Sequence, residues 1–380
     1  MKYFGNANVY VEGKGVVRTN LSFGARIEHI GGAASGEKIE LPSGAVVCPG
    51  FIDQHVHGAG GADAMDGSVG ALAVIADTLA KEGTTRFLAT TMTQSDANIR
   101  QAMRAVKAYR ESGRQEGAGI LGVHLEGPFI SPKHVGAQPP EYVVKPDIAA
   151  FDVWQSESGN AVRLITIAPE EEGAREFIRH AAAQNVRVSA GHSDAGYEDV
   201  CRAAECGLTS VTHTFNAQRG VHHREIGVAG AAMLCDTLYA ELIADGIHVS
   251  VPAMRLLYKN KPRGKLILIT DSIRAKGIGE GESELGGQKV YVRGGEARLG
   301  NGALAGSVLA MNVAVRNLVQ KAGVPFTDAI DCASLHPAEH LGAAADLGSI
   351  REGKRADFVV LDEHCNVVLS VRDGNILYKA

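Results

Sequence analysis

The chain has 380 residues, of which 45% are hydrophobic and 21% charged, a composition typical of a soluble globular protein with one large domain and a smaller one. Its formal net charge of −5 excludes the positive overall field that binding to nucleic acid or to an anionic membrane would use. An anionic substrate would therefore need a local basic pocket.

The N-terminal residues lack the charged leader and the apolar segment of a secretory signal, and no run of about 18 apolar residues is present. Six cysteines are scattered through apolar segments without a Cys-x-x-Cys pair, which indicates reduced thiols rather than a cysteine-ligated metal. We expect a cytoplasmic protein that binds neither nucleic acid nor membrane.

Both chain ends have the pattern of short strands separated by glycine-rich turns. Strands are predicted over 8–11, 25–30 and 38–41, and again over 356–362 and 367–371, where Asp373-Gly374 is a hairpin signal. We expect residues 1–47 and 350–380 to pair into one small β-sandwich domain.

Between the two ends, strands and amphipathic helices alternate. Helices are predicted near 69–82, 96–112, 171–184, 195–206 and 252–261. The predicted strands are 46–58, 84–91, 120–126, 163–168, 187–190, 210–212, 239–244 and 265–270. Eight apolar strands with alternating helices predict an α/β fold of the (β/α)₈ TIM-like barrel type over residues 48–349.

Two segments depart from this regularity. A long loop over 127–146 follows the third strand, and the glycine-rich segment 277–306 contains a hairpin signal at Gly294-Gly295. Long loops at one end of a barrel commonly carry function, so both segments are expected near the site.

Candidate metal ligands lie at the predicted strand ends. His55 and His57 alternate along an extended strand, so their side chains share one face and can hold one ion. The carboxyl ends of barrel strands form the face on which active sites are built. The candidates that fall at these ends are His55, His57, Glu126, His192, His213 and Asp271.

These residue types indicate the chemistry. Neutral imidazoles and carboxylates suit divalent zinc or iron, and Glu126, placed between a histidine pair and two further histidines, can bridge two ions. Such ions activate water as a nucleophile near neutral pH. Asp271 is then an additional carboxylate able to take up the water proton and pass it to a leaving group. The set predicts a metal-dependent hydrolase of amides or esters.

Six segments resemble N-acetylglucosamine-6-phosphate deacetylases of the amidohydrolase superfamily, in order and over nearly the whole chain. The segments at 124–129 (HLEGPF) and 212–217 (THTFNA) are the most specific, and the others are 51–58 (FIDQHVHG), 190–195 (AGHSDA), 244–248 (ADGIH) and 270–272 (TDS). The resemblance implies hydrolysis of the acetamide of an amino-sugar phosphate in amino-sugar catabolism, and a homodimer.

The resemblance also implies individual roles. Glu126, His192 and His213 match the common metal ligands, and His55 and His57 match a second-metal pair that some members have lost, so one or two ions are expected. Asp271 matches the catalytic acid and base. The positions that match substrate-binding residues are Ala137, Gln138, Asn216, Ala217, Arg224, His248, Ala305 and Gly306.

Gln138 departs from the family pattern, because many members carry a histidine that contacts the substrate carbonyl there. An amide can donate a hydrogen bond but cannot become cationic, so carbonyl polarisation is expected to depend more on metal. This is a further reason to expect an ion at His55 and His57.

Two alternatives remain. A cyclic amidase of the dihydroorotase type commonly bridges two metals with a carboxylated lysine on strand 4, yet residues 164–168 (LITIA) contain no lysine. A non-catalytic sugar-phosphate sensor would lose ligands or the acid/base, and all six positions are filled.

Overall fold

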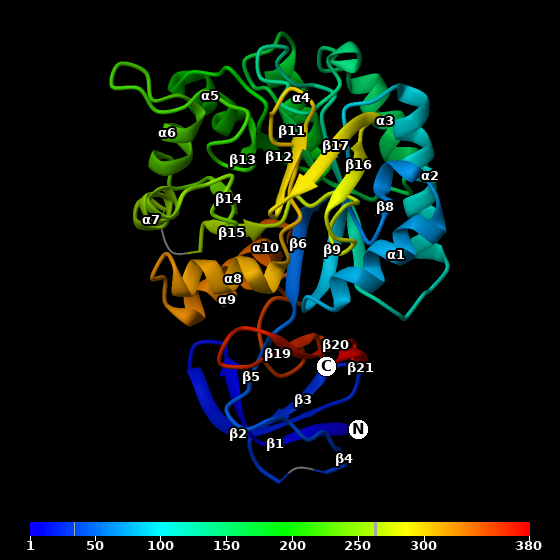
Figure 1. Ribbon diagram of the computed structural model, residues 1–380, viewed down its shortest axis with the longest axis vertical. Coiled ribbons are helices and arrows are strands. Elements are labelled where there is room, and N and C mark those ends of the chain that lie inside the picture. The colour runs from blue at the N-terminus through cyan, green and yellow to red at the C-terminus, as the bar shows by residue number, and fades with distance from the viewer. Residues whose placement is uncertain (34, 262–263) are drawn as a thin grey trace.

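The computed structural model describes residues 1–33, 35–261 and 264–380. Figure 1 shows a large barrel of strands and helices above a smaller strand-rich part that carries both chain termini. Within the described ranges, no helix is long and apolar enough to cross a membrane.

Eight parallel strands form the barrel in the order β15-β14-β13-β12-β11-β10-β9-β6. The ladder between β15 and β6 is nearly closed, since the backbone N–H of Asp271 donates to His55 O over 2.8 Å and Val56 bridges to Ser272. Seven of the eight predicted barrel strands are confirmed within a few residues. The bounds are β6 (Phe51–Val56), β9 (Thr84–Thr91), β10 (Gly119–Glu126), β11 (Val162–Ile167), β12 (Arg187–Ala190), β13 (Leu208–Val211), β14 (Tyr239–Ile243) and β15 (Leu266–Ile269).

Helices cover the outside of the barrel (Figure 1). Serines cap the first two, where Ser68 and Ser95 accept hydrogen bonds from Ala71 N and Asn98 N. The bounds are α1 (Val69–Ala80), α2 (Asp96–Glu111), α3 (Ile148–Glu157), α4 (Ala174–Ala183), α5 (Tyr197–Cys206), α6 (Gly227–Leu234), α7 (Val251–Asn260), α8 (Met311–Gln320), α9 (Phe326–Ala333) and α10 (Leu335–His340).

The first predicted strand, 46–58, is two strands in two different sheets. β5 (Val46–Pro49) pairs with β1 and β19 of the small part, and β6 begins the barrel after Gly50. Glycine is needed at this crossing, because a Cβ on Gly50 would lie 2.4 Å from Thr85 Oγ1. The sequence shows one apolar run because both strands are buried.

The small part is one hydrogen-bonded sheet curled around its own core, in the order β21-β20-β19-β5-β1-β2-β3, with β4 paired to β1. The rings of Phe4, Phe23 and Phe358 pack together there, with centroids 5.0–5.9 Å apart. The further bounds are β1 (Lys2–Val11), β2 (Gly15–Phe23), β3 (Ile27–Ile30), β4 (Glu37–Lys38), β19 (Phe358–Leu361), β20 (Val367–Arg372) and β21 (Asn375–Lys379).

Two details of the small sheet bear on the predictions. β2 was missed, because polar Arg18, Thr19 and Asn20 interrupt its apolar pattern. The predicted hairpin at Asp373-Gly374 is confirmed, with φ values of 49° and 75°. The division of the chain at residues 47 and 350 stays a prediction.

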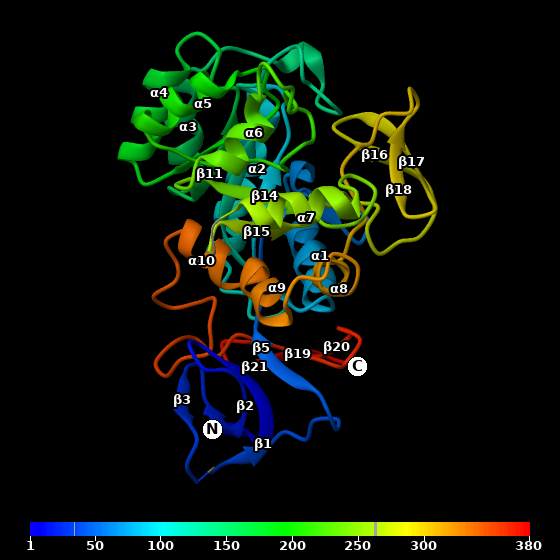
Figure 2. The ribbon, with the colours of Figure 1, turned by 90° about the vertical axis from the view of Figure 1, so that its left-hand side faces the viewer.

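A three-stranded antiparallel sheet interrupts the chain after β15 and projects from the barrel (Figure 2). Its strands are β16 (Gly281–Leu285), β17 (Gln288–Arg293) and β18 (Glu296–Leu299), and the predicted hairpin at Gly294-Gly295 joins the last two. The remaining short elements are β7 (Gly58–Ala59), β8 (Ala62–Asp63), and the 3₁₀ turns η1 (Ala64–Asp66) and η2 (Pro140–Tyr142).

His340 of α10 is buried against the barrel. Its Nδ1 lies 3.0 Å from Gln54 Oε1 and its Nε2 lies 3.1 Å from Thr209 Oγ1. Burial, reinforced by Arg187 and Lys265, lowers the pKa of this imidazole to about 3. The folded chain therefore holds a neutral histidine that the unfolded chain protonates below its ordinary pKa.

This histidine predicts a specific loss of stability in acid. Because its folded pKa is depressed, the stability present above pH ~6.5 declines as the pH falls toward 3, by about 2–3 kcal/mol at pH 4.5. A His340→Asn variant keeps a donor toward Gln54 and should show a flatter pH dependence. Urea unfolding at pH 7 and 4.5 measures the difference, and parallel curves for the two proteins would contradict the prediction.

Candidate active site

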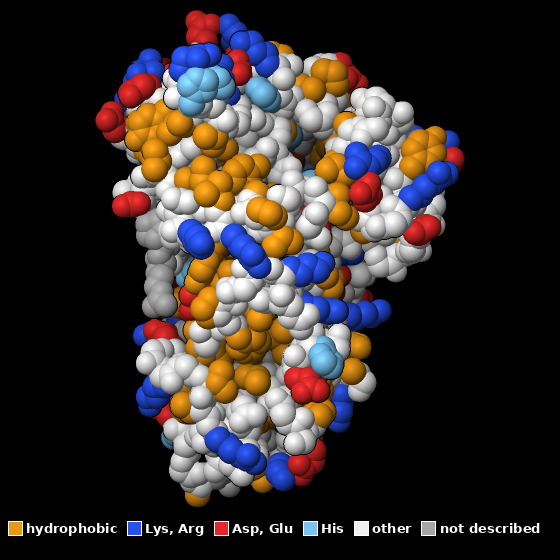
Figure 3. All heavy atoms as spheres, turned by 60° about the vertical axis from the view of Figure 1, so that its left-hand side comes forward, with side chains coloured by type: hydrophobic (Ala, Val, Ile, Leu, Met, Phe, Trp, Pro, Cys, Tyr) orange, Lys and Arg blue, Asp and Glu red, His pale blue; other side chains and the backbone are white. Residues whose placement is uncertain are grey.

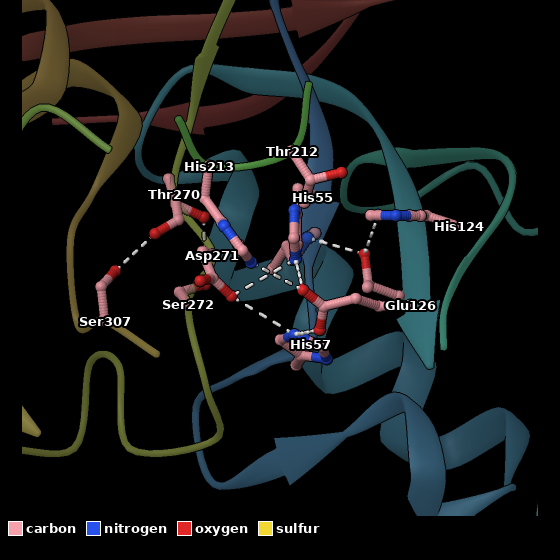
Figure 4. A network of polar contacts seen from close by, with 12 residues as sticks. His55, His57, His124, Glu126, Thr212, His213, Thr270, Asp271, Ser272 and Ser307 are labelled. Carbon is pink, nitrogen blue, oxygen red and sulfur yellow. Dashed lines mark hydrogen bonds and ion pairs between the residues drawn. The ribbon is translucent and has the colours of Figure 1, made fainter. Parts of the chain in front are cut away.

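The predicted ligands meet at the barrel mouth. Their side chains are buried and converge on one point, as Figure 4 shows for His55, His57, Glu126, His213 and Asp271. All come from the carboxyl ends of five barrel strands: His55 lies on β6 with His57 just after it, Glu126 ends β10, and His192, His213 and Asp271 each follow two residues after β12, β13 and β15.

Glu126 stands at the centre of this cluster. Its Oε1 lies 3.2 Å from His192 Nε2 and 3.1 Å from His213 Nε2. Oε1 is also 3.3 Å from His55 Nε2, and Oε2 is 3.2 Å from His57 Nε2. The carboxylate thus touches both histidine pairs, as the bridging assignment requires.

The cluster divides into two groups with the geometry of metal sites. His55, His57 and Asp271 form one, and Glu126, His192 and His213 form the other, with the ligand atoms of each group within 4.8 Å of one another. Asp271 Oδ1 lies 3.4 Å from His55 Nε2 and 3.3 Å from His57 Nε2.

The hydrogen bonds of His192, His213 and His55 indicate which of their ring nitrogens are available to a cation. His192 Nδ1 faces the carbonyl of His134 at 2.9 Å and must carry the proton, which leaves Nε2 with a free lone pair. His213 Nε2 lies only 3.2 Å from that nitrogen, and buried His55 Nε2 has no hydrogen-bond partner. Imidazole nitrogens crowded in this way, with carboxylates beside them, fit divalent ions.

The pKa shifts caused by the protein's own charges also indicate a site that favours a cation. Burial raises the pKa of the Glu126 carboxyl, but the neighbouring histidines, His55 first and then His192 and His213, hold it well below its usual range. Burial lowers the pKa of His57, yet Asp271 and Glu126 outweigh it and raise the value to about 9. The carboxylates thus favour positive charge at this point.

The backbone turns sharply where the ligands sit. His192, His213 and Asp271 have φ values of 48°, 27° and 49°, in the left-handed region that non-glycine residues rarely adopt. Strain of this kind persists where the surrounding structure determines the conformation, and it is concentrated at functional sites. Here it aims three strand-end side chains at one centre.

A cavity of about 260 Å³ opens over the cluster. Six of the eight residues predicted to bind substrate line it: Ala137, Gln138, Asn216, Ala217, His248 and Gly306. His248 is held by Asp245, whose Oδ2 lies 2.6 Å from His248 Nδ1, so Nε2 remains for a ligand. Asn216 Nδ2 donates to His213 O over 3.2 Å.

Gln138 lies at the wall of this cavity and is bonded at both ends. Its Oε1 accepts from Thr93 N over 2.8 Å, and its Nε2 donates to Glu126 Oε2 over 2.5 Å. These two hydrogen bonds fix the amide with its nitrogen toward Glu126, a candidate metal ligand.

Arg224 and Ala305 do not line the cavity. Ala305 is fully buried among apolar side chains next to Gly306. Arg224 lies in the exposed segment between β13 and α6, with its Nη1 2.7 Å from His223 Nε2. Among the described residues that line the cavity, none is lysine or arginine.

Figure 3 shows Lys, Arg and His side chains, with Asp and Glu among them, at the end of the molecule farthest from the small sheet. The segment with His222, His223 and Arg224 is exposed. It therefore has access to a neighbouring molecule.

Sequence reasoning missed three carboxylates around the candidate ligands, of which Asp53 and Glu241 are fully buried and Glu170 is half-buried. Asp53 accepts from His55 N and from Thr270 Oγ1, and Glu170 accepts from Ser193 Oγ. Glu241 faces His55 Nδ1 at 3.3 Å. The available signal for Glu241 was a charged residue inside the apolar strand β14.

Residues 46–378 match the model of the amidohydrolase family. The chain therefore belongs to the amidohydrolase family. Among relatives, an N-acetylglucosamine-6-phosphate deacetylase from Bacillus subtilis is 45% identical over 90% of this chain and 87% of that protein. An N-acetylgalactosamine-6-phosphate deacetylase from Escherichia coli O157:H7 is 41% identical over 85% of each chain.

Solved structures agree with this placement. N-acetylglucosamine-6-phosphate deacetylase from Thermotoga maritima superposes with a TM-score of 0.90, at 33% identity and full coverage of both chains. A mutant of the Mycobacterium smegmatis deacetylase in complex with N-acetyl-D-glucosamine-6-phosphate has a TM-score of 0.91 at 29% identity, covering 100% of this chain and 99% of that one.

Proposed function

We propose that this protein hydrolyses the acetamide of N-acetyl-D-glucosamine 6-phosphate to D-glucosamine 6-phosphate and acetate, in amino-sugar catabolism. The observation that carries the proposal is the pair of three-ligand groups joined through Glu126 at the mouth of the barrel. Relatives named for deacetylation of amino-sugar phosphates support the substrate class.

The proposed centre takes two divalent ions, of zinc or iron. Glu126, His192 and His213 would hold one, and His55 and His57 the other with Glu126 between them. Divalent ions supply an activated water and a polarised acyl oxygen at such sites. Asp271, whose Oδ1 faces both histidines of the second group, would accept the water proton and return it to the amine that leaves.

The rest of the cavity would bind the sugar phosphate. Asn216 and the backbone at Ala217 line the wall after β13, and His248 presents Nε2 on the adjacent side. Gln138 is bonded to Glu126 and Thr93, so we assign it to orienting the bridge as well as to substrate contact.

Arg224 would contact the phosphate of a substrate bound in a second copy, because it does not line the cavity of its own chain. A guanidinium matches phosphate oxygens with two parallel hydrogen bonds. We therefore propose a homodimer in which each chain completes the other's site.

The two alternative functions are less well supported. β11 (Val162–Ile167) carries no lysine, so the carboxylated lysine of a cyclic amidase has no counterpart on that strand. A sensor without catalysis has no use for Asp271, which is buried within reach of two histidines.

An acetate-release assay tests the function. Purified protein loaded with zinc or iron should release acetate from N-acetylglucosamine 6-phosphate much faster than from N-acetylglucosamine. N-acetylgalactosamine 6-phosphate, the named substrate of one relative, is the competing compound. No acetate from either phosphate, with both metals tried, would refute the proposal.

Replacing Arg224 tests the phosphate contact. Arg224→Ala should raise KM for the 6-phosphate by an amount equivalent to about 1.5–3 kcal/mol, since charge-assisted hydrogen bonds are lost. Activity on unphosphorylated N-acetylglucosamine should barely change. Arg175→Ala, at an exposed arginine on α4, is the matched control. Equal losses on both substrates would indicate structural damage instead.

Mixing two impaired variants, assayed at a low concentration of the 6-phosphate, decides whether Arg224 acts across subunits. In a hybrid dimer of Arg224→Ala and Asp271→Asn chains, one site has Asp271 and receives Arg224 from its partner. Random reassembly should restore about a quarter of wild-type activity if the sites are completed in this way. If Arg224 served its own chain, no site in the hybrid would be intact and no activity would return.

A further inference from the structure

Glu241 is a fully buried carboxylate in the middle of the barrel strand β14. Its neighbours in that strand are apolar, and it carries none of the roles assigned above. A buried carboxylate is costly unless its oxygens are hydrogen-bonded, so its partners indicate what it does.

Three donors point at this carboxylate. Gln54 Nε2 lies 2.6 Å from Oε1, while His55 Nδ1 and His213 N each lie 3.3 Å from Oε2. Because a carboxylate only accepts hydrogen bonds, the proton of the His55 imidazole must sit on Nδ1. His55 Nε2 then faces Glu126 and Asp271 with its lone pair.

The orientation of Glu241 is itself fixed from behind. Gln54 turns its amide nitrogen toward the carboxylate, so its Oε1 is left to accept from His340 Nδ1 over 3.0 Å. His340 in turn has Thr209 Oγ1 at 3.1 Å from its other nitrogen. A buried series of hydrogen bonds thus runs from α10, through Gln54, to the mouth of the barrel.

We propose that Glu241 is the positioning residue for the second metal site. It holds the His55 imidazole in one tautomer and one orientation, with Nε2 presented to the ion. Through His55 it sets how tightly the ion at His55 and His57 is bound, and Gln54 and His340 hold the carboxylate for this task. The inference rests on the proposed two-ion centre.

Replacing Glu241 with glutamine tests this role, since the side chain keeps its size and loses one acceptor. Outer hydrogen-bond partners of metal-binding histidines typically change metal affinity by 10–100-fold. Glu241→Gln should therefore lower the affinity for the ion at His55 and His57 by 10–100-fold, measured by competition with a chelator. The ion at Glu126, His192 and His213 should stay bound.

A double-mutant cycle separates positioning from a general structural effect. If Glu241 acts through His55, adding Glu241→Gln to a His55→Gln protein should change metal content and affinity no further. Asp331→Asn, at a carboxylate that accepts from Tyr10 far from the site, is the control and should bind metal as the wild type does. Thermal unfolding of the metal-free proteins shows whether each variant is folded.

Two results would overturn the inference: wild-type affinity for both ions in Glu241→Gln, or losses from Glu241→Gln and His55→Gln that simply add. Failure of the two-ion proposal would give a different result from these two. The wild-type protein itself would then bind one ion per chain under saturating zinc or iron.

Discussion

Changing Asp271 to asparagine should lower turnover by about 100-fold or more, because an amide can neither take the proton of the attacking water nor deliver it to the amine. Asparagine has the same shape and tolerates the φ of 49° at this position. The strand end should therefore keep its course, and the change should act on the proton transfer rather than on the fold.

Steady-state kinetics with metal analysis on the same samples makes this test decisive. Asp271 Oδ1 lies within 3.4 Å of both His55 and His57, so the ion content must be measured beside turnover. The ion at Glu126, His192 and His213 should be retained. Asp236→Asn, at an exposed aspartate, is the matched control. Turnover near the wild-type value would reject Asp271 as the acid and base.

The second large effect concerns metal content. A His55→Gln/His57→Asn double variant should lose close to one equivalent of metal and keep the other. Both replacements remove an imidazole from the group that includes Asp271 while leaving Glu126, His192 and His213 in place. Two ions about 3.5–4 Å apart are typical of binuclear hydrolases, so activity should fall as well.

Elemental analysis of fully metallated wild-type and double-variant proteins checks this result. The His192→Gln variant serves as the reciprocal case, since it removes a ligand from the other group. A single ion per wild-type chain, or equal metal in the wild type and the double variant, would refute the two-ion centre.

The sequence alone determined the barrel and the set of candidate ligands that it brings together. Strand and helix periods are local properties, so eight apolar strands could be read in order, and seven of them lie within a few residues of their predicted bounds. Parallel strands end at one edge of a barrel, so residues such as His55, Glu126 and His213, distant in sequence, could be expected to meet.

Only the tertiary structure decided which groups support those candidate ligands and which predicted residues lie outside the cavity. Glu241 faces His55 although they are 186 residues apart, and no local pattern specifies that pairing because it depends on strand register across the barrel. Arg224 is displaced from the cavity by the path of the segment between β13 and α6, which local propensity does not encode. Gly50 likewise separates two sheets because Thr85, from another strand, packs against it.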